Sequence, residues 1–380
     1  MKRIQSITIP RALDDNPYQS LLVEHLQTFD VQVDRPDLGA YFFLPFVFSK
    51  WKPDVVHFHW LHPLCLATRR SMALRRTVIF IAQLLVLKLL GIKIVWTVHN
   101  LKNHENQHLD LDRFCTTVVA RIADAILAHC EAARQDVITM FALKNTDKVF
   151  AVPHGNYVNY YENKIDRVEA RKSLDLDDAN LAFLFLGAIR PYKGVLELLD
   201  AFKHLQHDNI RLVIAGKVSH SDQATTELFE QKIADDKRVK FIPGFVADDQ
   251  IQHYMNACDV VIFPYRDVLT SGSVLLAMSF DRACIAPQKG CIGEVLDRAG
   301  SFLYDIDGVD GLRHSMQSAI QKQSALLEMG QHNRQLAEAY SWTRVAEMTV
   351  NIYRWCLNRS ERVKTPSFVN HQTPVDGESC

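Results

Sequence analysis

The sequence predicts an α/β protein built from two Rossmann-like domains. Along 380 residues, short apolar runs rich in β-formers alternate with helical stretches. This alternation is typical of βαβ units and parallel sheets. It is interrupted once, by the polar stretch "GNYVNYYENKIDR" at 155–167. We therefore expect one domain over 1–160 and a second over 165–338.

Each half of the chain offers six candidate strands. The uniformly apolar character of most of them predicts strands covered by helices on both faces. In the first half we expect strands at 3–9, 31–33, 54–59, 93–98, 125–129 and 148–153, with helices at 17–29, 71–90 and 131–141. In the second half we expect strands at 181–187, 210–216, 239–244, 259–264, 283–287 and 301–304, with helices at 194–206, 222–235, 247–257 and 272–280.

The end of the chain breaks the alternation. Residues 339–359 place Trp342, Val345, Met348, Ile352 and Trp355 near helical spacing, which predicts an amphipathic helix. Residues 365–380 carry Pro, Gly, Ser and Asn with few apolar anchors, so we expect a disordered tail.

The composition excludes several classes of protein. A net charge of −1 gives no global field that would attract nucleic acid. Eight scattered cysteines form no C-x-x-C pair, which argues against a zinc knuckle or a thioredoxin motif. No signal-peptide pattern is present, so the cytoplasm is the expected compartment.

The segment 69–90 allows two interpretations. Its apolar run "TVIFIAQLLVLKLL" is shorter than the roughly 20 residues of a spanning helix and contains Gln83 and Lys88. We favour a helix packed on a sheet. The alternative is a basic, apolar face resting on an anionic membrane, since Arg69, Arg70, Arg75 and Arg76 precede the run.

The stretch "GAIRPYKG" at 187–194 predicts an anion site. Arg190 and Lys193 lie between two glycines where a strand gives way to a helix. Free N–H groups and the helix dipole favour an anion at such a turn, and cations there oppose the dipole unless an anion is present. Neither a Walker loop nor a dinucleotide fingerprint is present. We interpret the turn as a phosphate site.

A second turn of this kind lies in "FPYRDVLTSGSVLLAMSF" at 263–280. A strand ends, a polar loop follows and an apolar helix begins near Gly272, with Thr270, Ser271 and Ser273 as possible caps. Simple capping would explain this turn alone. Two such turns in one domain favour a diphosphate held between them, because ligands bind at the carboxyl edge of an α/β sheet.

The first domain offers histidines after its strands. His99 follows a strand in "TVHNLKNHENQH", and His154 with Gly155 ends the domain in "VPHGNY". His104, Glu105 and His108 match the H-E-x-x-H zinc motif in letters, but the asparagines around them disfavour a helix and no third ligand is evident. The D-x-D triplets at 110, 175 and 305 follow no cleft-lining strand. We expect neither a metal nor another cofactor.

Together these motifs resemble the GT-B glycosyltransferases, in particular the large retaining family four and its bacterial polysaccharide-assembly members. The motifs are "TVHN", "HGNY", "GAIRPYKG", "IAGK", the 263–280 stretch and the terminal "YSW…IYRW", and the likeness covers roughly residues 1–360. It implies two domains facing across a cleft, with the helix 340–359 crossing back to brace the N-terminal, acceptor-side domain. The C-terminal domain would then bind the nucleotide sugar.

The resemblance also implies residue roles. Arg190 and Lys193 would hold the donor diphosphate next to Gly187, and His99 would face the donor sugar. Asn16 and Tyr18 in the first loop would lie on the acceptor side. The remaining donor-side residues would be Ser271, Gly272, Ser273, Val274 and Glu294. We add Asp267 and His154 as donor-side candidates from their place in the sequence, with the alternative that His154 and Gly155 only form a hinge between the domains.

This chain departs from the family pattern. The family typically has two glutamates separated by seven intervening residues, and here those positions fall near Val268 and at Leu276. Asp267 is the nearest carboxylate, and ribose must be recognised in another way. Ala188 replaces the arginine that usually follows the first glycine of the turn.

The motifs and the resemblance together predict a metal-independent glycosyltransferase of polysaccharide biosynthesis, and the resemblance alone implies that it is retaining. It would move a sugar from a UDP- or GDP-linked donor to a hydroxyl of a glycan, with a lipid-linked acceptor. It would be cytoplasmic, at the inner face of the plasma membrane if 69–90 touches lipid. Two alternatives stay open at this point: a nucleotide-sugar epimerase, and a non-catalytic GT-B scaffold of an assembly complex.

Overall fold

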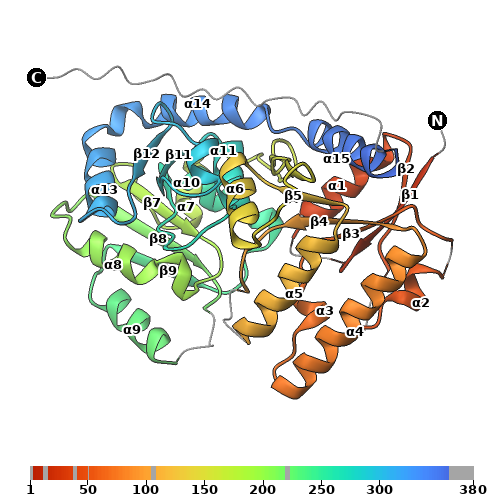
Figure 1. Ribbon diagram of the computed structural model, residues 1–380. Helices are drawn as coiled ribbons and strands as arrows, with labels where there is room; N and C mark the ends of the chain where they lie inside the picture. Colours follow the sequence, from red (N-terminus) through yellow and green to blue (C-terminus); the bar gives the residue numbers. More distant parts are fainter. Residues whose placement is uncertain are drawn as a thin grey trace, which may run out of the picture. The chain divides into compact units, whose positions relative to one another are not determined.

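A computed structural model describes residues 3–11, 16–36, 41–49, 51–103, 108–218 and 223–358 (Figure 1). The predicted tail at 365–380 and residues 104–107 of the H-E-x-x-H match lie outside this range. The chain forms two compact units. Unit 1 comprises Met1–Gly155 and the segment that starts at Tyr340, and unit 2 comprises Asn156–Ala339.

Unit 1 is a parallel six-stranded sheet with the order β2-β1-β3-β4-β5-β6. Its strands are almost wholly buried except β2, where only Val31 is buried. Figure 1 shows α1 and α15 on one side of this sheet and α3, α4 and α5 on the other. The elements are β1 (Ile4–Ile9), α1 (Tyr18–Gln27), β2 (Val31–Asp34), α2 (Leu44–Val47), β3 (Val55–Phe58), α3 (His62–Cys65), α4 (Arg70–Leu89), β4 (Lys93–Val98), α5 (Leu109–Ile122), β5 (Ala125–Ala128), α6 (Glu131–Met140), β6 (Val149–Ala151) and α15 (Trp342–Leu357).

Helix α15 completes the core of unit 1 although it follows unit 2 in the chain. The side chain of Ser341 caps it by accepting a hydrogen bond from the Arg344 N–H. Its buried face packs on α1 and β4. Tyr353 reaches His57 in β3, with 2.7 Å between the hydroxyl and Nδ1. The helix predicted from apolar spacing at 339–359 is therefore present and belongs to the first sheet.

Unit 2 is a second parallel six-stranded sheet with the order β12-β11-β10-β7-β8-β9. Its helices pack in pairs, α8 with α9 and α13, α7 with α10, and α11 with α14. The elements are α7 (Arg167–Ser173), β7 (Leu181–Leu186), the 3₁₀ turn η1 (Pro191–Lys193), α8 (Val195–Lys203), β8 (Ile210–Gly216), α9 (Gln223–Ala234), β9 (Val239–Pro243), η2 (Asp248–Gln250), α10 (Ile251–Ala257), β10 (Val260–Ile262), α11 (Gly272–Ser279), β11 (Ala283–Pro287), α12 (Ile292–Val295), β12 (Ser301–Tyr304), α13 (Gly311–Gln321), η3 (Gln323–Ala325) and α14 (Leu326–Glu338).

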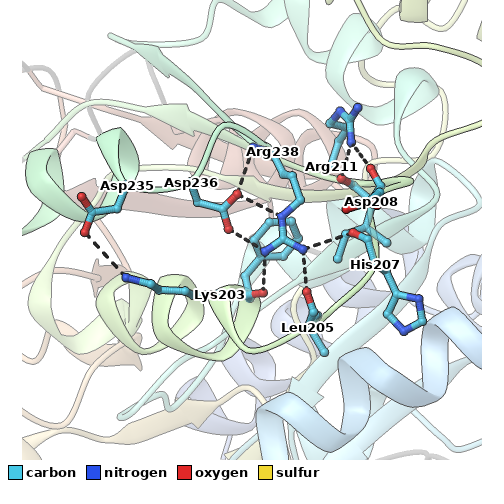
Figure 2. A network of polar contacts seen from close by, with 10 residues as sticks. Lys203, Leu205, His207, Asp208, Arg211, Asp235, Asp236 and Arg238 are labelled. Carbon is cyan, nitrogen blue, oxygen red and sulfur yellow. Dashed lines mark hydrogen bonds and ion pairs between the residues drawn. The ribbon is translucent and has the colours of Figure 1, made fainter.

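A polar network around Arg238 lies at the edge of this second sheet where β9 begins (Figure 2). The Arg238 guanidinium donates to both carboxylate oxygens of Asp236, at 3.0 and 2.7 Å, and to the carbonyls of Leu205 and His207. It also lies 4.8 Å from the ring centroid of Phe202. These contacts tie the end of α8 to the start of β9, so we assign the network a structural role.

Helix α4 is a packed helix, as we favoured for the segment 69–90, and it also has an exposed apolar face. One face is buried against the sheet, including Phe80, Leu84 and Leu87. Within the described residues, no helix is long and apolar enough to cross a membrane. The other face nevertheless exposes large apolar side chains: Met72, Leu74, Val78, Leu85, Val86 and Leu89.

Candidate functional site

The strand order of unit 2 creates a switch point between β7 and β10. These strands are neighbours, and from them the chain proceeds to β8 and β9 on one side and to β11 and β12 on the other. A crevice forms outside the carboxyl ends of strands at such a point. The turn at 187–194 follows β7, and the loop at 263–271 follows β10. The two turns predicted to hold anions therefore start from adjacent strands.

The first turn needs glycine at both ends. Gly187 has φ +135° and Gly194 has φ +67°, in the region where glycine is preferred. A Cβ on Gly194 would lie 1.8 Å from the carbonyl oxygen of Pro264, so the turn packs directly against the loop after β10. Between the glycines, residues 191–193 form a 3₁₀ turn instead of the start of a longer helix, and α8 begins at Val195.

Tyr265 joins the two turns. Its buried ring lies 5.7 Å from the Lys193 ammonium, measured to the ring centroid, which is within cation–π range. The Ser271 hydroxyl lies 3.5 Å from the Tyr265 hydroxyl, and Ser271 is the N-cap residue of α11. Lys193 and the N-terminus of α11 thus converge on one phenol. The sequence motif contains Tyr265, but sequence reasoning assigned it no role.

The cations of the turn are uncompensated. Neither Arg190 nor Lys193 has a carboxylate partner within the part of the chain that the structure describes, and both are half-buried. Desolvation lowers the pKa of Lys193, and the nearby Arg190 charge lowers it further. A bound anion would relieve this repulsion. Such an arrangement suits an anion, and Gly272, Ser273 and Val274 form the first turn of α11.

The two predicted carboxylates, Asp267 and Glu294, lie in different segments of unit 2. Asp267 is exposed in the loop after β10, and Glu294 is exposed in the short helix α12 after β11. Both lie at the carboxyl side of the same sheet. Leu276, at a position where the family has a glutamate, is buried inside α11. The structure thus shows an apolar side chain where the resemblance leads one to expect a hydrogen-bonding group.

The predicted residues of unit 1 gather around Tyr18. The Asn16 side chain accepts a hydrogen bond from the Tyr18 N–H at 3.1 Å, which fixes the start of α1. The Tyr18 ring makes edge contacts, with centroids at 4.8 Å from His99 and 4.9 Å from His154. Trp342 of α15 lies 5.2 Å from it. Asn16, Tyr18, His99 and His154 therefore share one end of the first sheet.

Five histidines are buried at this end of unit 1, three more than the sequence argument identified. His57 and His59 come from β3 and the residue after it, His99 follows β4, His129 follows β5 and His154 follows β6. Burial lowers the pKa of His57 and His129 to about 3 and that of His154 to about 4. Burial and the neighbouring rings hold the pKa of His59 and His99 well below its ordinary range. All five rings are neutral near pH 7.

These histidines do not form a metal centre. Most of their ring nitrogens face one another, a hydroxyl or a backbone carbonyl. Within the described residues, no group of three His, Cys, Asp or Glu side chains could hold a metal ion.

Comparisons with known proteins agree with this geometry. Residues 180–344 match the family described as "Glycosyl transferases group 1", and residues 14–156 match "Glycosyltransferase Family 4". The two matches fall on unit 2 and unit 1 respectively. The chain belongs to the family-four glycosyltransferases of the GT-B fold. It is an enzyme of the glycosyltransferase class.

Relatives with named activities lie within the same class. A GDP-mannose:glycolipid 4-beta-D-mannosyltransferase from Xanthomonas campestris pv. campestris is 28% identical over 255 residues, 66% of this chain and 67% of the relative. A lipopolysaccharide 1,2-N-acetylglucosaminetransferase from Salmonella typhimurium is 28% identical over 209 residues, 52% of this chain and 54% of the relative.

Solved structures share the fold of this glycosyltransferase. Sucrose-phosphate synthase from Thermosynechococcus elongatus superposes with a TM-score of 0.75 at 15% identity, over 94% of this chain and 100% of the other. Anabaena Alr3699/HepE in complex with UDP and glucose gives a TM-score of 0.71 at 15% identity, over 91% and 98%. The prediction of two Rossmann-like domains of the GT-B type is confirmed.

Proposed function

We propose that this glycosyltransferase moves a sugar from a nucleoside diphosphate sugar to a hydroxyl of a lipid-linked glycan. The observation that carries the proposal is the convergence of Lys193 and the α11 N-terminus on Tyr265, beside the uncompensated Arg190. GDP-mannose is the first donor to test, because the Xanthomonas relative is named for it. The UDP complex of the Anabaena structure makes UDP-sugars the second.

The chemistry depends on stabilising the leaving group. As the bond between the sugar and the diphosphate breaks, negative charge builds on the β-phosphate. Lys193, Arg190 and the free N–H groups of α11 neutralise it without reorganising, since the fold already holds them at one edge of the sheet. These groups supply the positive charge that a divalent ion supplies in other transferases. We therefore propose that the transfer is metal-independent, and EDTA should leave its rate unchanged.

The decisive experiment replaces each cation in turn. A charge-assisted hydrogen bond contributes about 1.5–3 kcal/mol, so Arg190→Ala or Lys193→Ala should each lower kcat/KM by about 10- to 150-fold. Lys203→Ala is the matched control, because this exposed cation lies at the far end of α8. Transfer is measured with GDP-mannose and UDP-sugars on lipid extracts. Full activity in both turn variants would exclude the phosphate assignment.

The stereochemistry needs its own measurement. The family resemblance implies retention of the anomeric configuration, and we adopt retention as the proposal. The name of the Xanthomonas relative specifies a beta-mannoside product, which an alpha-linked GDP-mannose donor gives by inversion, so that name favours the opposite outcome. The anomeric configuration of donor and product is read from the one-bond C1–H1 coupling in NMR spectra. A product with the donor's configuration supports retention, and one with the opposite configuration overturns it.

The exposed face of α4 supports the lipid-linked acceptor. The apolar side chains of this face follow an arginine-rich start, where Arg69 and Arg75 are exposed. Phenylalanines 42, 46 and 48 are also exposed in the neighbouring segment, which the Gln83 side chain holds to α4 through the backbone of Tyr41, Phe43 and Leu44. Cations with apolar side chains favour an anionic bilayer. We propose peripheral binding at the inner face of the plasma membrane.

Liposome flotation tests this contact. The wild-type chain should float with phosphatidylglycerol vesicles and less well with neutral ones. Leu85→Glu should abolish flotation, because it places a charge in the exposed apolar face. Leu327→Glu is the matched control, since Leu327 on α14 is a leucine at least as exposed, at 67% against 49% for Leu85. Absence of flotation with the wild-type chain would refute the membrane contact.

A further inference from the structure

Three of the buried histidines of unit 1 form a continuous hydrogen-bonded row. His59 Nδ1 lies 3.1 Å from His99 Nε2, and His99 Nδ1 lies 3.2 Å from His129 Nε2. At the end of the row, His129 Nδ1 lies 3.1 Å from the carbonyl oxygen of Val152. The side chains are 1%, 8% and 3% exposed, so water does not compete for these contacts.

The carbonyl of Val152 determines every proton position in this row. A carbonyl oxygen only accepts, so His129 must carry its proton on Nδ1. Its Nε2 is then an acceptor, and His99 must donate to it from Nδ1. His99 Nε2 is thereby an acceptor as well, and His59 must donate to it from Nδ1. Each neutral ring is left with one proton, on Nδ1.

The row ends at His59 Nε2, which this assignment leaves unprotonated. Among buried side-chain atoms of the described residues, His59 Nε2 is one of the few without a hydrogen-bond partner. The cavity that borders His59, Trp60 and His99 measures about 10 Å³, no larger than one water molecule needs.

The neighbours of His99 fix its ring plane as well as its protons. Trp60 stacks on it with 4.4 Å between centroids and 14° between planes, while Tyr18 meets it edge-on. A flip of the ring would exchange Nδ1 with a carbon and break both hydrogen bonds. The His99 ring is therefore held in one orientation and one tautomer before any ligand arrives.

We propose that His59 and His129 are positioning residues that hold His99 in its Nδ1–H tautomer, with both ring nitrogens occupied by protein. This inference rests on the proposed function for the role of His99 at the donor sugar. It adds that His99 acts there through its fixed ring and main chain, without a free N–H group. Because the His99 ring is already ordered in the free enzyme, the reaction does not have to supply the free energy that ordering it would cost.

The first test needs no substrate. Long-range ¹H–¹⁵N NMR spectra of the ligand-free chain, labelled on histidine, identify which ring nitrogen carries the proton. His59, His99 and His129 should all be Nδ1–H, the opposite of the tautomer that free histidine favours. Signals are assigned by single substitutions. An Nε2–H tautomer at His99 in the wild-type chain would overturn the proposal, whatever the enzyme transfers.

The second test separates positioning from packing. His129→Phe fills the space but removes the acceptor, so the His99 signal should show mixed tautomers, and kcat/KM should fall about tenfold, the loss of one hydrogen bond. His129→Gln restores an acceptor oxygen and should return both the tautomer and most of the activity. An unchanged tautomer and rate in His129→Phe would contradict the proposal. If His129→Phe does not fold, the wild-type spectrum still decides.

Discussion

Acidification should destabilise unit 1 selectively. The five buried histidines are neutral in the folded chain, whereas they titrate near their ordinary value of 6.5 in the unfolded chain. Because the histidine pKa is lower in the folded chain, the unfolded chain binds more protons than the folded chain below about pH 6.5. Stability is therefore unaffected above about pH 6.5 and falls below it, until the folded rings titrate near pH 3 to 4.

The expected loss is large compared with the stability of a domain. At pH 5 the unfolded value lies about 1.5 units above the solution pH, which corresponds to about 2 kcal/mol for each histidine that stays neutral when folded. His57, His129 and His154 together amount to about 6 kcal/mol, and His59 and His99 act in the same direction. Whole domains are stable by only about 5–15 kcal/mol.

The chain provides its own assay for this prediction. All five tryptophans lie in unit 1, so urea unfolding followed by tryptophan fluorescence reports on that unit alone. Measured between pH 8 and pH 5, the unfolding free energy should drop with increasing slope below pH 6.5. His57→Gln removes one titrating ring and should lower that slope by about 1.4 kcal/mol per pH unit.

His314→Gln provides the control, because His314 is exposed on α13 in unit 2. Comparison at pH 8 isolates the packing cost of each substitution, since this pH lies well above the ordinary histidine value of 6.5. Parallel pH profiles for wild type and His57→Gln would refute the reasoning that burial keeps these rings neutral.

Two further predictions concern unit 2. Asp236→Asn should destabilise it by about 1.5–3 kcal/mol at pH 7, because Arg238 loses its charged partner. Hydrogen exchange of the β8 and β9 amides measures this loss. Because Arg238 lowers the pKa of Asp236, the difference in stability from wild type should shrink below about pH 4, where the carboxylate becomes protonated. A difference that persists below about pH 4 would contradict the ion pair. Gly194→Ala should destabilise unit 2 and abolish transfer, because its Cβ would overlap the Pro264 carbonyl. Gly91→Ala is the control, because Gly91 has a similar positive φ but nothing lies within 4 Å of the new Cβ. Thermal unfolding should show only the backbone cost of about 1–2 kcal/mol for Gly91→Ala. Equal destabilisation by Gly194→Ala and Gly91→Ala would rule out the overlap.

Much of the fold could be predicted from periodicity. The twelve strands of the described residues lie where apolar runs predicted them, with ends displaced by two residues at most. Such runs are informative because strands buried on both faces need apolar residues along their length. The turn after β7 and the helix start at Gly272 were found because glycine and cations at a strand end have few structural explanations.

The partners of these residues could not be found in the same way. Tyr265 contacts Lys193 only because β7 and β10 are adjacent, and a linear sequence does not state strand order. His59, His99 and His129 follow three different strands, and they meet only once β3, β4 and β5 are aligned. The alternation of His57 and His59 along one strand was the signal that could have pointed to one buried face.

The place of α15 has a consequence during synthesis. Its residues emerge from the ribosome after all of unit 2, yet Trp342 and Tyr353 fill the middle of the first sheet's histidine-lined end. Unit 1 therefore cannot complete its fold until α15 has been synthesised, whereas unit 2 can fold as soon as its last residue has emerged. A nascent chain halted near residue 339 should display a protease-resistant C-terminal body and a cleavable N-terminal one, the reverse of the order in which they were translated.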